Sequence, residues 1–214
     1  MSLSVKICGI NSRDAVEAAV QGADFVGFIF YPPSPRYVDP EVAAQLATLV
    51  PDHIKKVGVF VDPDPAQIDD TLLRLRLDAL QLHGTESPRN IDELRQTFRL
   101  PIIKAIKVAD ATDVEGARAF EGHADYLMFD AKPPANQPGL LPGGNALSFD
   151  WRLLAGQSWK TPWFLSGGLS AANLAEAIRL SGAKLVDVSS GVELRPGVKD
   201  PGKIAKFLAQ AALL

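Results

Sequence analysis

Short apolar segments recur along the chain, and polar residues, Gly and Pro separate them. Each segment is three to six residues long and rich in Val, Ile, Leu and Phe. This composition is typical of strands that are buried on both faces of a parallel sheet. Eight segments are predicted to be strands: Val5–Cys8, Phe25–Phe30, Lys56–Val61, Ala79–Leu82, Ile102–Ile106, Tyr126–Phe129, Trp163–Leu165 and Leu185–Val188.

The stretches between these strands have the apolar spacing of amphipathic helices. One such stripe contains Leu174, Ala177 and Ile178. Gly22 and Gly182 are predicted to end helices. Four helices are predicted to begin where a capping side chain precedes Pro, because the side chain accepts from a free first-turn amide and Pro needs no partner there. These pairs are Asp39-Pro40, Asp64-Pro65, Ser87-Pro88 and Asp200-Pro201.

Strand and helix therefore alternate eight times in 214 residues. Helical crossovers make the strands parallel, which is compatible with either a closed barrel or an open doubly wound sheet. Eight units with no surplus strand favour the barrel. Because no linker or change of composition marks a boundary, residues 1–214 are predicted to form a single (β/α)8 barrel domain.

Charge and cysteine content narrow the function classes. The net charge is −3 and the charges are scattered, unlike the basic surface of a nucleic-acid binder. The one cysteine, Cys8, excludes an intramolecular disulfide and a multi-cysteine metal site, and it fits a reducing cytosol. We find neither a signal-peptide pattern nor an apolar stretch of membrane-spanning length. We expect a cytoplasmic protein with no nucleic-acid or membrane partner.

The active site of such a barrel lies at the C-terminal ends of its strands. The candidates are therefore the residues at or just after each strand end: Cys8, 31–36, Asp62, His83, Lys107, Asp130, 166–168 and 187–191.

Two of these strand ends are suited to phosphate. Ser166-Gly167-Gly168 follows the seventh strand and Ser189-Ser190-Gly191 the eighth. Glycines allow close approach of the backbone to an anion, and hydroxyls and amides supply donors. The glycines could instead only turn the chain, but their occurrence after two consecutive late strands favours a phosphate site.

Two other strand ends carry groups that can exchange protons. Cys8 could be a reactive thiol or only a packed side chain. Lys6 points to the same side of its strand, and we expect it to favour the thiolate of Cys8. Asp130 could cap the following loop or act as an acid or base, and partial burial would help it stay protonated.

Two further side chains are candidates for substrate binding. Arg36 follows a proline-rich loop that would position its guanidinium against a planar carboxylate, although a solvated surface arginine is the ordinary alternative. His83 could bind substrate or satisfy a backbone group. No other His or Glu stands at zinc-ligand spacing, so we predict no metal site.

Seven sequence blocks in a fixed order cover nearly the whole chain. They are Val5-Lys-Ile-Cys-Gly9, Gly27–Phe30 with Ser34-Pro-Arg36, Val57-Gly-Val-Phe-Val61, Leu80-Gln-Leu-His-Gly84, Phe149-Asp-Trp151, Leu165-Ser-Gly-Gly-Leu169, and Asp187–Glu193 followed by Pro196-Gly197 and Lys199-Asp200. Each block alone is weak, but together and in register they are specific. The set resembles the phosphoribosylanthranilate isomerase family.

The resemblance implies a cofactor-independent isomerase of tryptophan biosynthesis. Its reaction is an Amadori rearrangement of N-(5-phosphoribosyl)anthranilate to the corresponding 1-amino-1-deoxyribulose 5-phosphate. By match to the family pattern, Cys8 removes the C2 proton and Asp130 protonates the ring oxygen. Arg36 holds the anthranilate carboxylate, and His83 and Asp187 also bind the substrate.

By the same match, the phosphate is bound by Gly167, Gly168, Ser189, Ser190 and Gly191. The resemblance leaves the oligomeric state open between homodimer and monomer. It also leaves two alternatives, a histidine-pathway barrel isomerase and a non-catalytic phosphosugar-binding barrel. The former would carry a carboxylate where Cys8 stands, and the latter would lack the acid or the base.

One segment departs from the family pattern. The family usually has a Gly-Gly-Thr/Ser-Gly run before Phe-Asp-Trp, but here Asn145 and Ala146 follow the two glycines. The segment belongs to the long loop 132–148, and loops of this length are usually functional or disordered. Because of the departure, we assign no role to Gly143 and Gly144 or to the rest of the Pro142–Ser148 loop.

Overall fold

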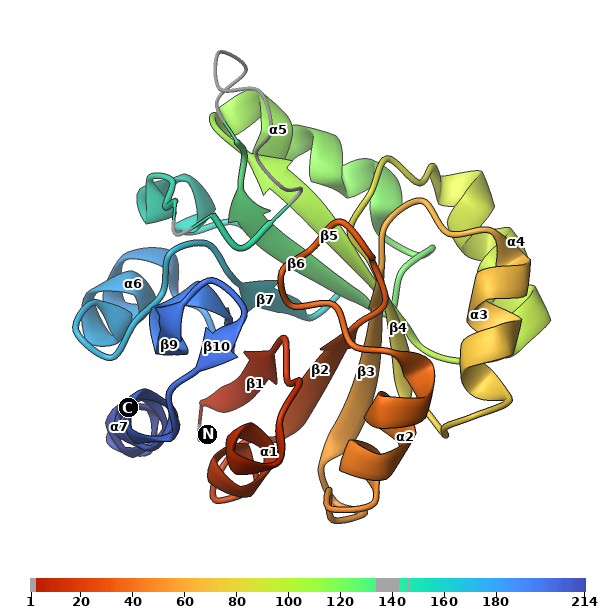
Figure 1. Cartoon of the computed structure of the whole chain (residues 1–214). Coiled ribbons are helices and arrows are strands. Elements are labelled where there is room, and N and C mark those ends of the chain that lie inside the picture. Colours follow the sequence, from red (N-terminus) through yellow and green to blue (C-terminus); the bar gives the residue numbers. More distant parts are fainter. Residues whose placement is uncertain (1–2, 134–142, 146) are drawn as a thin grey trace.

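Eight parallel strands pair in sequence order and close into a barrel, with β1 bonded to β8 (Figure 1). The structure is a computed structural model that describes residues 3–133, 143–145 and 147–214. The predicted barrel is confirmed. Its strands are β1 Ser4–Cys8, β2 Phe25–Ile29, β3 Lys55–Phe60, β4 Ala79–Leu82, β5 Ile102–Val108, β6 Tyr126–Ala131, β7 Trp163–Leu165 and β8 Leu185–Val188.

Helices lie on the outside of the strands (Figure 1). The α-helices are α1 Arg13–Ala19, α2 Pro40–Ala47, α3 Pro65–Leu72, α4 Pro88–Phe98, α5 Ala111–Gly116, α6 Leu174–Ser181 and α7 Pro201–Ala211. The 3-10 helices are η1 Ala117–Phe120, η2 Trp151–Leu154 and η3 Ser190–Val192.

The predicted helix starts are confirmed, because each of the four capping side chains accepts from a first-turn amide. Gly182 ends α6 in the left-handed conformation, with φ of 76°, as predicted. The prediction for Gly22 was wrong: α1 ends at Ala19, and Val20 caps it. Val20 keeps right-handed helical geometry, so the end of α1 requires no glycine.

A short antiparallel hairpin was not predicted. Its strands are β9 Glu193–Arg195 and β10 Val198–Lys199. Both strands are very short and carry charged side chains, so they lack the apolar run that marked the barrel strands. The hairpin follows η3 and leads into α7, on the same side of the barrel as β1 (Figure 1).

The lower part of the barrel interior is filled by aromatic rings from β2, β6 and β7, and β2 lies across the barrel from the neighbouring strands β6 and β7. Phe25 packs edge-on against Phe164 at 5.3 Å between ring centroids, and Tyr126 lies 5.6 Å from Phe164. Such contacts across the barrel require these side chains to point inward. They pack with a small buried cluster formed by Val57, Ala79, Ile103, Ala105, Met128 and Phe164.

Inward and outward side chains alternate along each strand, so the next inward positions after the aromatic rings lie at the C-terminal end of the barrel. Ser166 lies two residues after Phe164, and Asp130 lies two residues after Met128, so they share the inward face of β7 and β6. The larger core lies between the strands and the helices and includes Phe28, Phe60 and Phe129, all fully buried. The fold thus places polar side chains above an apolar floor.

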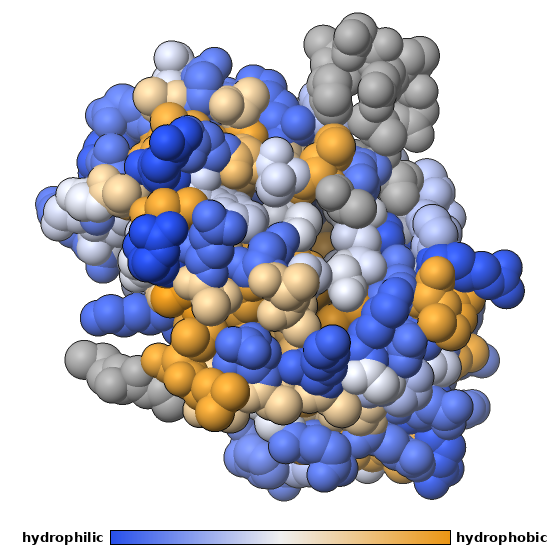
Figure 2. All heavy atoms as spheres, turned by 90° about the vertical axis from the view of Figure 1, so that its left-hand side faces the viewer, coloured by the Kyte–Doolittle hydropathy of each residue, from blue (hydrophilic) through white to orange (hydrophobic). Residues whose placement is uncertain are grey.

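The outer face over α6, α7 and the hairpin has a mixed surface. Hydrophilic and hydrophobic residues intermingle there, and the hydrophobic ones form small separate groups (Figure 2). Among the described residues, every helix is too short or too polar to span a membrane.

The aromatic floor predicts a large stability effect at Phe164. The Phe164→Ala variant should lower the free energy of unfolding by about 3–5 kcal/mol, because a fully buried ring leaves a cavity that the rigid barrel cannot fill. Denaturant titration followed by circular dichroism measures this. Leu213→Ala is the control, since Leu213 is 80% exposed. Equal effects of the two substitutions would contradict the floor's importance.

Candidate active site

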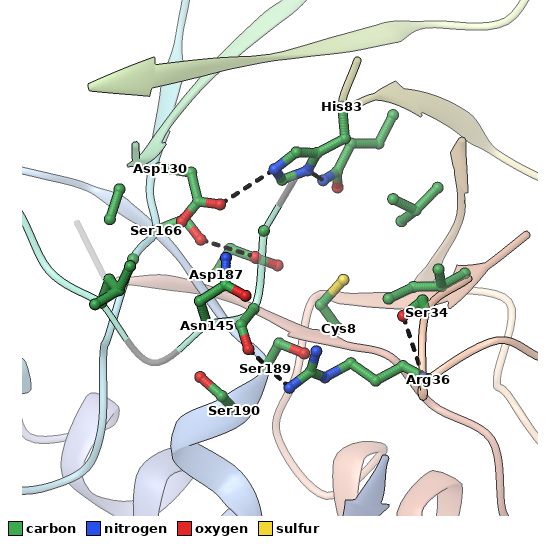
Figure 3. A pocket seen from close by; sticks show the side chains of 18 of the residues that line it. Cys8, Ser34, Arg36, His83, Asp130, Asn145, Ser166, Asp187, Ser189 and Ser190 are labelled. Carbon is green, nitrogen blue, oxygen red and sulfur yellow. Dashed lines mark hydrogen bonds and ion pairs between the residues drawn. The ribbon is translucent and has the colours of Figure 1, made fainter. Parts of the chain in front are cut away.

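A pocket opens at the C-terminal ends of the strands, where the active site was expected. Nine of the ten residues predicted for the site line it, and the side chains of those that are not glycine converge there (Figure 3). They are Cys8, Arg36, His83, Asp130, Gly167, Gly168, Asp187, Ser189 and Ser190. The pocket encloses about 770 Å³ including its open mouth. Of the other strand-end candidates, Asp62 and Lys107 are not among the described lining residues.

Gly191, the tenth predicted residue, lies in η3 next to the lining residue Ser190. A Cβ at this position would overlap the carbonyl oxygen of Leu169. Its glycine therefore allows the loop after β8 to pack against the loop after β7. Gly191 therefore supports the shape of the site, and its expected role in binding phosphate stays a prediction.

Asp130 is the last of three buried side chains, Gln81, His83 and Asp130, that hydrogen bonds link in a row. Its Oδ2 lies 3.1 Å from His83 Nε2, and Gln81 Nε2 lies 2.9 Å from His83 Nδ1. Because the Gln81 amide donates to Nδ1, the other ring nitrogen carries the proton and donates to Asp130. His83 therefore bonds to the carboxylate of Asp130, which was neither of the two partners considered from the sequence. Asp130 itself points into the pocket as an acid–base candidate, not outward as a loop cap (Figure 3).

Gln81 was not singled out from the sequence. It lines the pocket, is almost fully buried, and its amide oxygen has no partner among the described residues. Two signals could have found it: it lies within the Leu80–Gly84 block, and it stands two residues before His83 on the inward face of β4. A polar side chain that is buried inside a barrel is expected to make hydrogen bonds.

Cys8 lies beside a buried ion pair. Lys6 Nζ donates to Asp187 Oδ1 at 2.7 Å, and Ser166 Oγ donates to Asp187 Oδ2 at 3.2 Å. Lys6 is fully buried. Burial acts to lower the pKa of Lys6, but the charges of Asp187 and Cys8 outweigh it, so that its pKa is raised. Lys6 is therefore a fixed positive charge beside the thiol.

The protonation of Cys8 differs from the expectation. Burial raises the pKa of the Cys8 thiol, and Asp187 raises it further, while Lys6 acts in the opposite direction. The predicted effect of Lys6 has the right sign, but desolvation is larger, so burial favours the neutral thiol. A thiolate must form with help from Lys6 against this cost.

Arg36 is buried, so the alternative of a solvated surface arginine was wrong. Its Nε donates to Glu193 Oε1 at 2.8 Å and its Nη2 to Glu193 Oε2 at 2.9 Å. Its Nη2 also donates to the carbonyl oxygen of Gly144 at 2.9 Å. Glu193 and its second partner, Lys199, were not singled out from the sequence, although both lie in the blocks that carry the family resemblance.

The loops after β7 and β8 have the geometry of an anion site. Gly167 and Gly168 have φ of 86° and 66°, and a Cβ on Gly167 would lie 2.8 Å from the amide nitrogen of Ala131. Both positions therefore require glycine. Helix η3 begins at Ser190 with no side-chain hydrogen bond capping its first amides. Uncapped amides at a helix start favour a bound anion.

Gly143 and Gly144 also approach the site closely, although no role was assigned to them. A Cβ on Gly143 would lie 2.7 Å from both Asp130 Oδ2 and His83 Nε2. A Cβ on Gly144 would overlap Nη1 of Arg36. The two glycines thus let the backbone cover the acid and the arginine. Residues 134–142 and 146 of this loop, including Pro142 and Ala146, lie outside the described residues.

The part of the chain that the structure describes shows no evident metal-binding centre. There, no group of three or more His, Cys, Asp or Glu side chains is placed to hold a metal ion. What the pocket does combine is a thiol, a carboxylic acid, an arginine and an anion site. The arginine and the anion site can bind an anionic substrate at two points, and the thiol and the carboxylic acid can exchange protons with it.

A family model described as N-(5'-phosphoribosyl)anthranilate isomerase matches residues 5–210. The chain is 55% identical over 215 residues to a protein of that name from Rhodospirillum centenum, with full coverage of both chains.

Solved structures agree with this. The crystal structure of phosphoribosyl anthranilate isomerase from Thermotoga maritima superimposes with a TM-score of 0.87 at 37% identity, covering 99% of this chain and 100% of the other. A second structure, of such an isomerase in complex with reduced 1-(o-carboxyphenylamino)-1-deoxyribulose 5-phosphate, has a TM-score of 0.82 at 34% identity, with coverages of 99% and 100%.

The position of Lys6 predicts how Cys8 titrates. In Lys6→Met the pKa of Cys8 should rise further, because the positive charge that opposes desolvation is gone. The thiolate absorbance at 240 nm, taken as the difference from a Cys8→Ser protein, reports this titration. Lys6→Arg is the matched control, since it keeps the charge beside Asp187. Titration of Cys8 at an unchanged pH in a folded Lys6→Met protein would remove Lys6 from the account.

Proposed function

The chain belongs to the N-(5'-phosphoribosyl)anthranilate isomerase family, and we propose that it catalyses that family's aldose–ketose rearrangement with Cys8 as general base and Asp130 as general acid. The observation that carries the assignment of roles is their placement in one pocket. Cys8 ends β1 and Asp130 lies near the end of β6, while the two glycine-serine loops follow β7 and β8 between them in the barrel order. A phosphosugar anchored on those loops extends between the acid and the base.

Ring opening is the first step of the proposed mechanism. A protonated Asp130 gives its proton to the furanose ring oxygen, and the bond from that oxygen to C1 breaks. The lone pair of the anthranilate nitrogen forms a double bond to C1, which gives a positively charged Schiff base. Since the substrate's own nitrogen supplies the electrons, the step needs no redox cofactor.

Proton removal at C2 is the second step. The Cys8 thiolate takes the C2 proton, and the electron pair of that bond forms a C1–C2 double bond as the nitrogen regains its lone pair. The resulting enol then tautomerises to the 2-ketose, because C1 gains a proton while the hydroxyl on C2 loses its proton and becomes the carbonyl group. Positioned acid and base groups of this kind contribute about 10²–10⁴-fold each to the rate.

Lys6 and His83 support the two proton transfers. Lys6 holds a positive charge near the thiolate that must form, which opposes the effect of burial on Cys8. His83 holds the carboxylate of Asp130 through Nε2 and so keeps it directed at the pocket. Asp187 is already bonded to Lys6 and Ser166, and its remaining acceptor sites suit a ribose hydroxyl.

Anionic groups at both ends of the substrate would set its orientation. The phosphate binds the amides and hydroxyls of Gly167, Gly168, Ser189 and Ser190, and the anthranilate carboxylate binds Arg36. Binding energy from these remote groups is available to align C1 and C2 with the reacting side chains. Gly191, in the first turn of η3, contributes through loop packing and is proposed to bind the phosphate through its backbone amide.

A non-catalytic or differently specific phosphosugar-binding barrel is the alternative. It would be expected to lack the acid or the base, and both Cys8 and Asp130 lie in this pocket. The oligomeric state, homodimer or monomer, and the cytoplasmic location stay predictions.

Turnover assays test the roles of Cys8 and Asp130. Phosphoribosylanthranilate is generated in situ, with EDTA present, and the loss of its fluorescence is followed. We expect Cys8→Ala and Asp130→Ala each to be slower than the unsubstituted protein by at least ~10²-fold, the typical loss for an acid or base. Asp92→Asn is the matched control, because Asp92 is a carboxylate on α4 bonded to His123 outside the pocket.

The outcomes separate the reaction from the roles. Absence of turnover by the unsubstituted protein would overturn the isomerase function. Turnover that survives Cys8→Ala would keep the reaction but reject Cys8 as the base, and the same holds for Asp130 as the acid.

A further inference from the structure

A buried cluster of charges lies beneath one wall of the pocket. Glu193 is almost fully buried and accepts from Arg36 through both carboxylate oxygens, at 2.8 and 2.9 Å. Lys199 Nζ donates to the same Glu193 Oε1 at 2.8 Å. We infer that Glu193, held by Lys199, is a positioning residue that orients Arg36 for the carboxylate of the substrate. The inference rests on the proposed function, in which Arg36 binds that carboxylate.

The pairing of Arg36 with Glu193 fixes one edge of the guanidinium. Two parallel bonds use Nε and Nη2, which locks the plane and the rotation of the group. The remaining corner, Nη1, faces Gly144 at the pocket, because a Cβ built on Gly144 would overlap it. Figure 3 shows this guanidinium directed toward Ser189 and the pocket interior. An arginine without Glu193 would have many more rotamers to lose on binding.

Charge balance in the cluster matches a singly charged ligand group. Two cations, Arg36 and Lys199, share one carboxylate, which leaves one net positive charge. Burial lowers the pKa of Lys199, but Glu193 acts against this, and the three oxygen acceptors around Nζ favour the ammonium form. Burial acts to raise the pKa of Glu193, but Arg36 and Lys199 outweigh it and hold that pKa below its usual range, so Glu193 is ionised. Lys199 Nζ makes hydrogen bonds to three oxygens, which fits the three donors of an ammonium group. A benzoate-type carboxylate would neutralise the excess.

The hairpin β9–β10 joins the two ends of the pocket. Lys199 donates to the carbonyl oxygen of Ser189 at 2.9 Å and to its Oγ at 3.1 Å, within the loop proposed to bind phosphate. At the turn, a Cβ on Gly197 would overlap the carbonyl oxygen of Pro35, next to Arg36. Asn11 Nδ2 also donates to the Gly197 carbonyl at 2.9 Å. One hairpin therefore holds both the arginine and the phosphate loop.

A purely structural salt bridge is the competing explanation, and the chain contains a matched example. Lys104 and Glu86 form a buried pair at 2.6 Å, with side chains as inaccessible as those of Arg36 and Glu193. Neither Lys104 nor Glu86 is among the lining residues of the pocket. Loss of either pair should destabilise the fold. Only loss of Glu193 should change how a ligand's carboxylate is recognised.

Ligand binding distinguishes the two explanations. Reduced 1-(o-carboxyphenylamino)-1-deoxyribulose 5-phosphate and its phenylamino counterpart, which lacks the carboxylate, are titrated calorimetrically into the unsubstituted protein, Glu193→Gln and Glu86→Gln. We expect Glu193→Gln to raise the Kd of the carboxylated ligand by roughly 10-fold or more, because an oriented charged contact is lost. The Kd of the ligand without the carboxylate should rise by less than about 3-fold. Glu86→Gln should show no such difference between the ligands.

Turnover and a variant cycle add two readouts. The effect of Glu193→Gln on turnover should lie mainly in KM and not in kcat. In an Arg36→Met background, Glu193→Gln should cause no further carboxylate-specific loss, because Glu193 acts through Arg36. If Glu193→Gln does not fold, Glu193→Asp replaces it. The shorter carboxylate keeps the charge but cannot span both nitrogens and Lys199 as well, so a smaller loss of the same kind is expected.

Each outcome has one meaning. Equal weakening of both ligands by Glu193→Gln would reduce Glu193 to a structural role, and unchanged or tighter binding of the carboxylated ligand would reject the inference outright. Failure of the unsubstituted protein to bind the carboxylated ligand or to turn over would overturn the proposed function instead. The two failures are therefore distinguishable.

Discussion

The pairing of β1 with β8 is the constraint on which the site depends. In this register Lys6 stands opposite Asp187, and the same pairing closes the barrel. The ion pair beside Cys8 is therefore a consequence of closure. A slip of β1 by one residue would turn Lys6 outward, toward the apolar helix layer, and leave Asp187 buried without its partner. The catalytic environment and the topology are thus specified by one set of backbone hydrogen bonds.

Alternation along the strands separates stability from chemistry. On β7 and β6, Phe164 and Met128 fill the floor, and the next inward positions, Ser166 and Asp130, face the pocket. Each strand therefore contributes to the apolar core at one level and to the site at the next. A rigid floor keeps the polar side chains above it within narrow limits, as proton transfer requires.

Buried ion pairs orient the charged groups of the pocket, and their burial lowers the stability of the fold. Lys6 with Asp187 and Arg36 with Glu193 are both inaccessible to solvent, and removing such charges from water opposes folding. What they provide is direction, because each fixes a charged group that the proposed mechanism uses. Burial also favours the neutral thiol of Cys8, so the same dry environment that strengthens these pairs resists formation of the thiolate.

The sequence by itself determined the barrel and most of the residues in the pocket. Apolar runs located all eight strands, Asp-Pro and Ser-Pro pairs located helix starts, and strand ends pointed to Cys8, Asp130 and the phosphate loops. These signals are local or repeat with the period of one element. Only the tertiary structure decided that Glu193 holds Arg36, from 157 residues away, and that His83 holds Asp130. Such partners meet because the barrel closes, and a pattern confined to one segment carries no record of which distant side chain lies opposite.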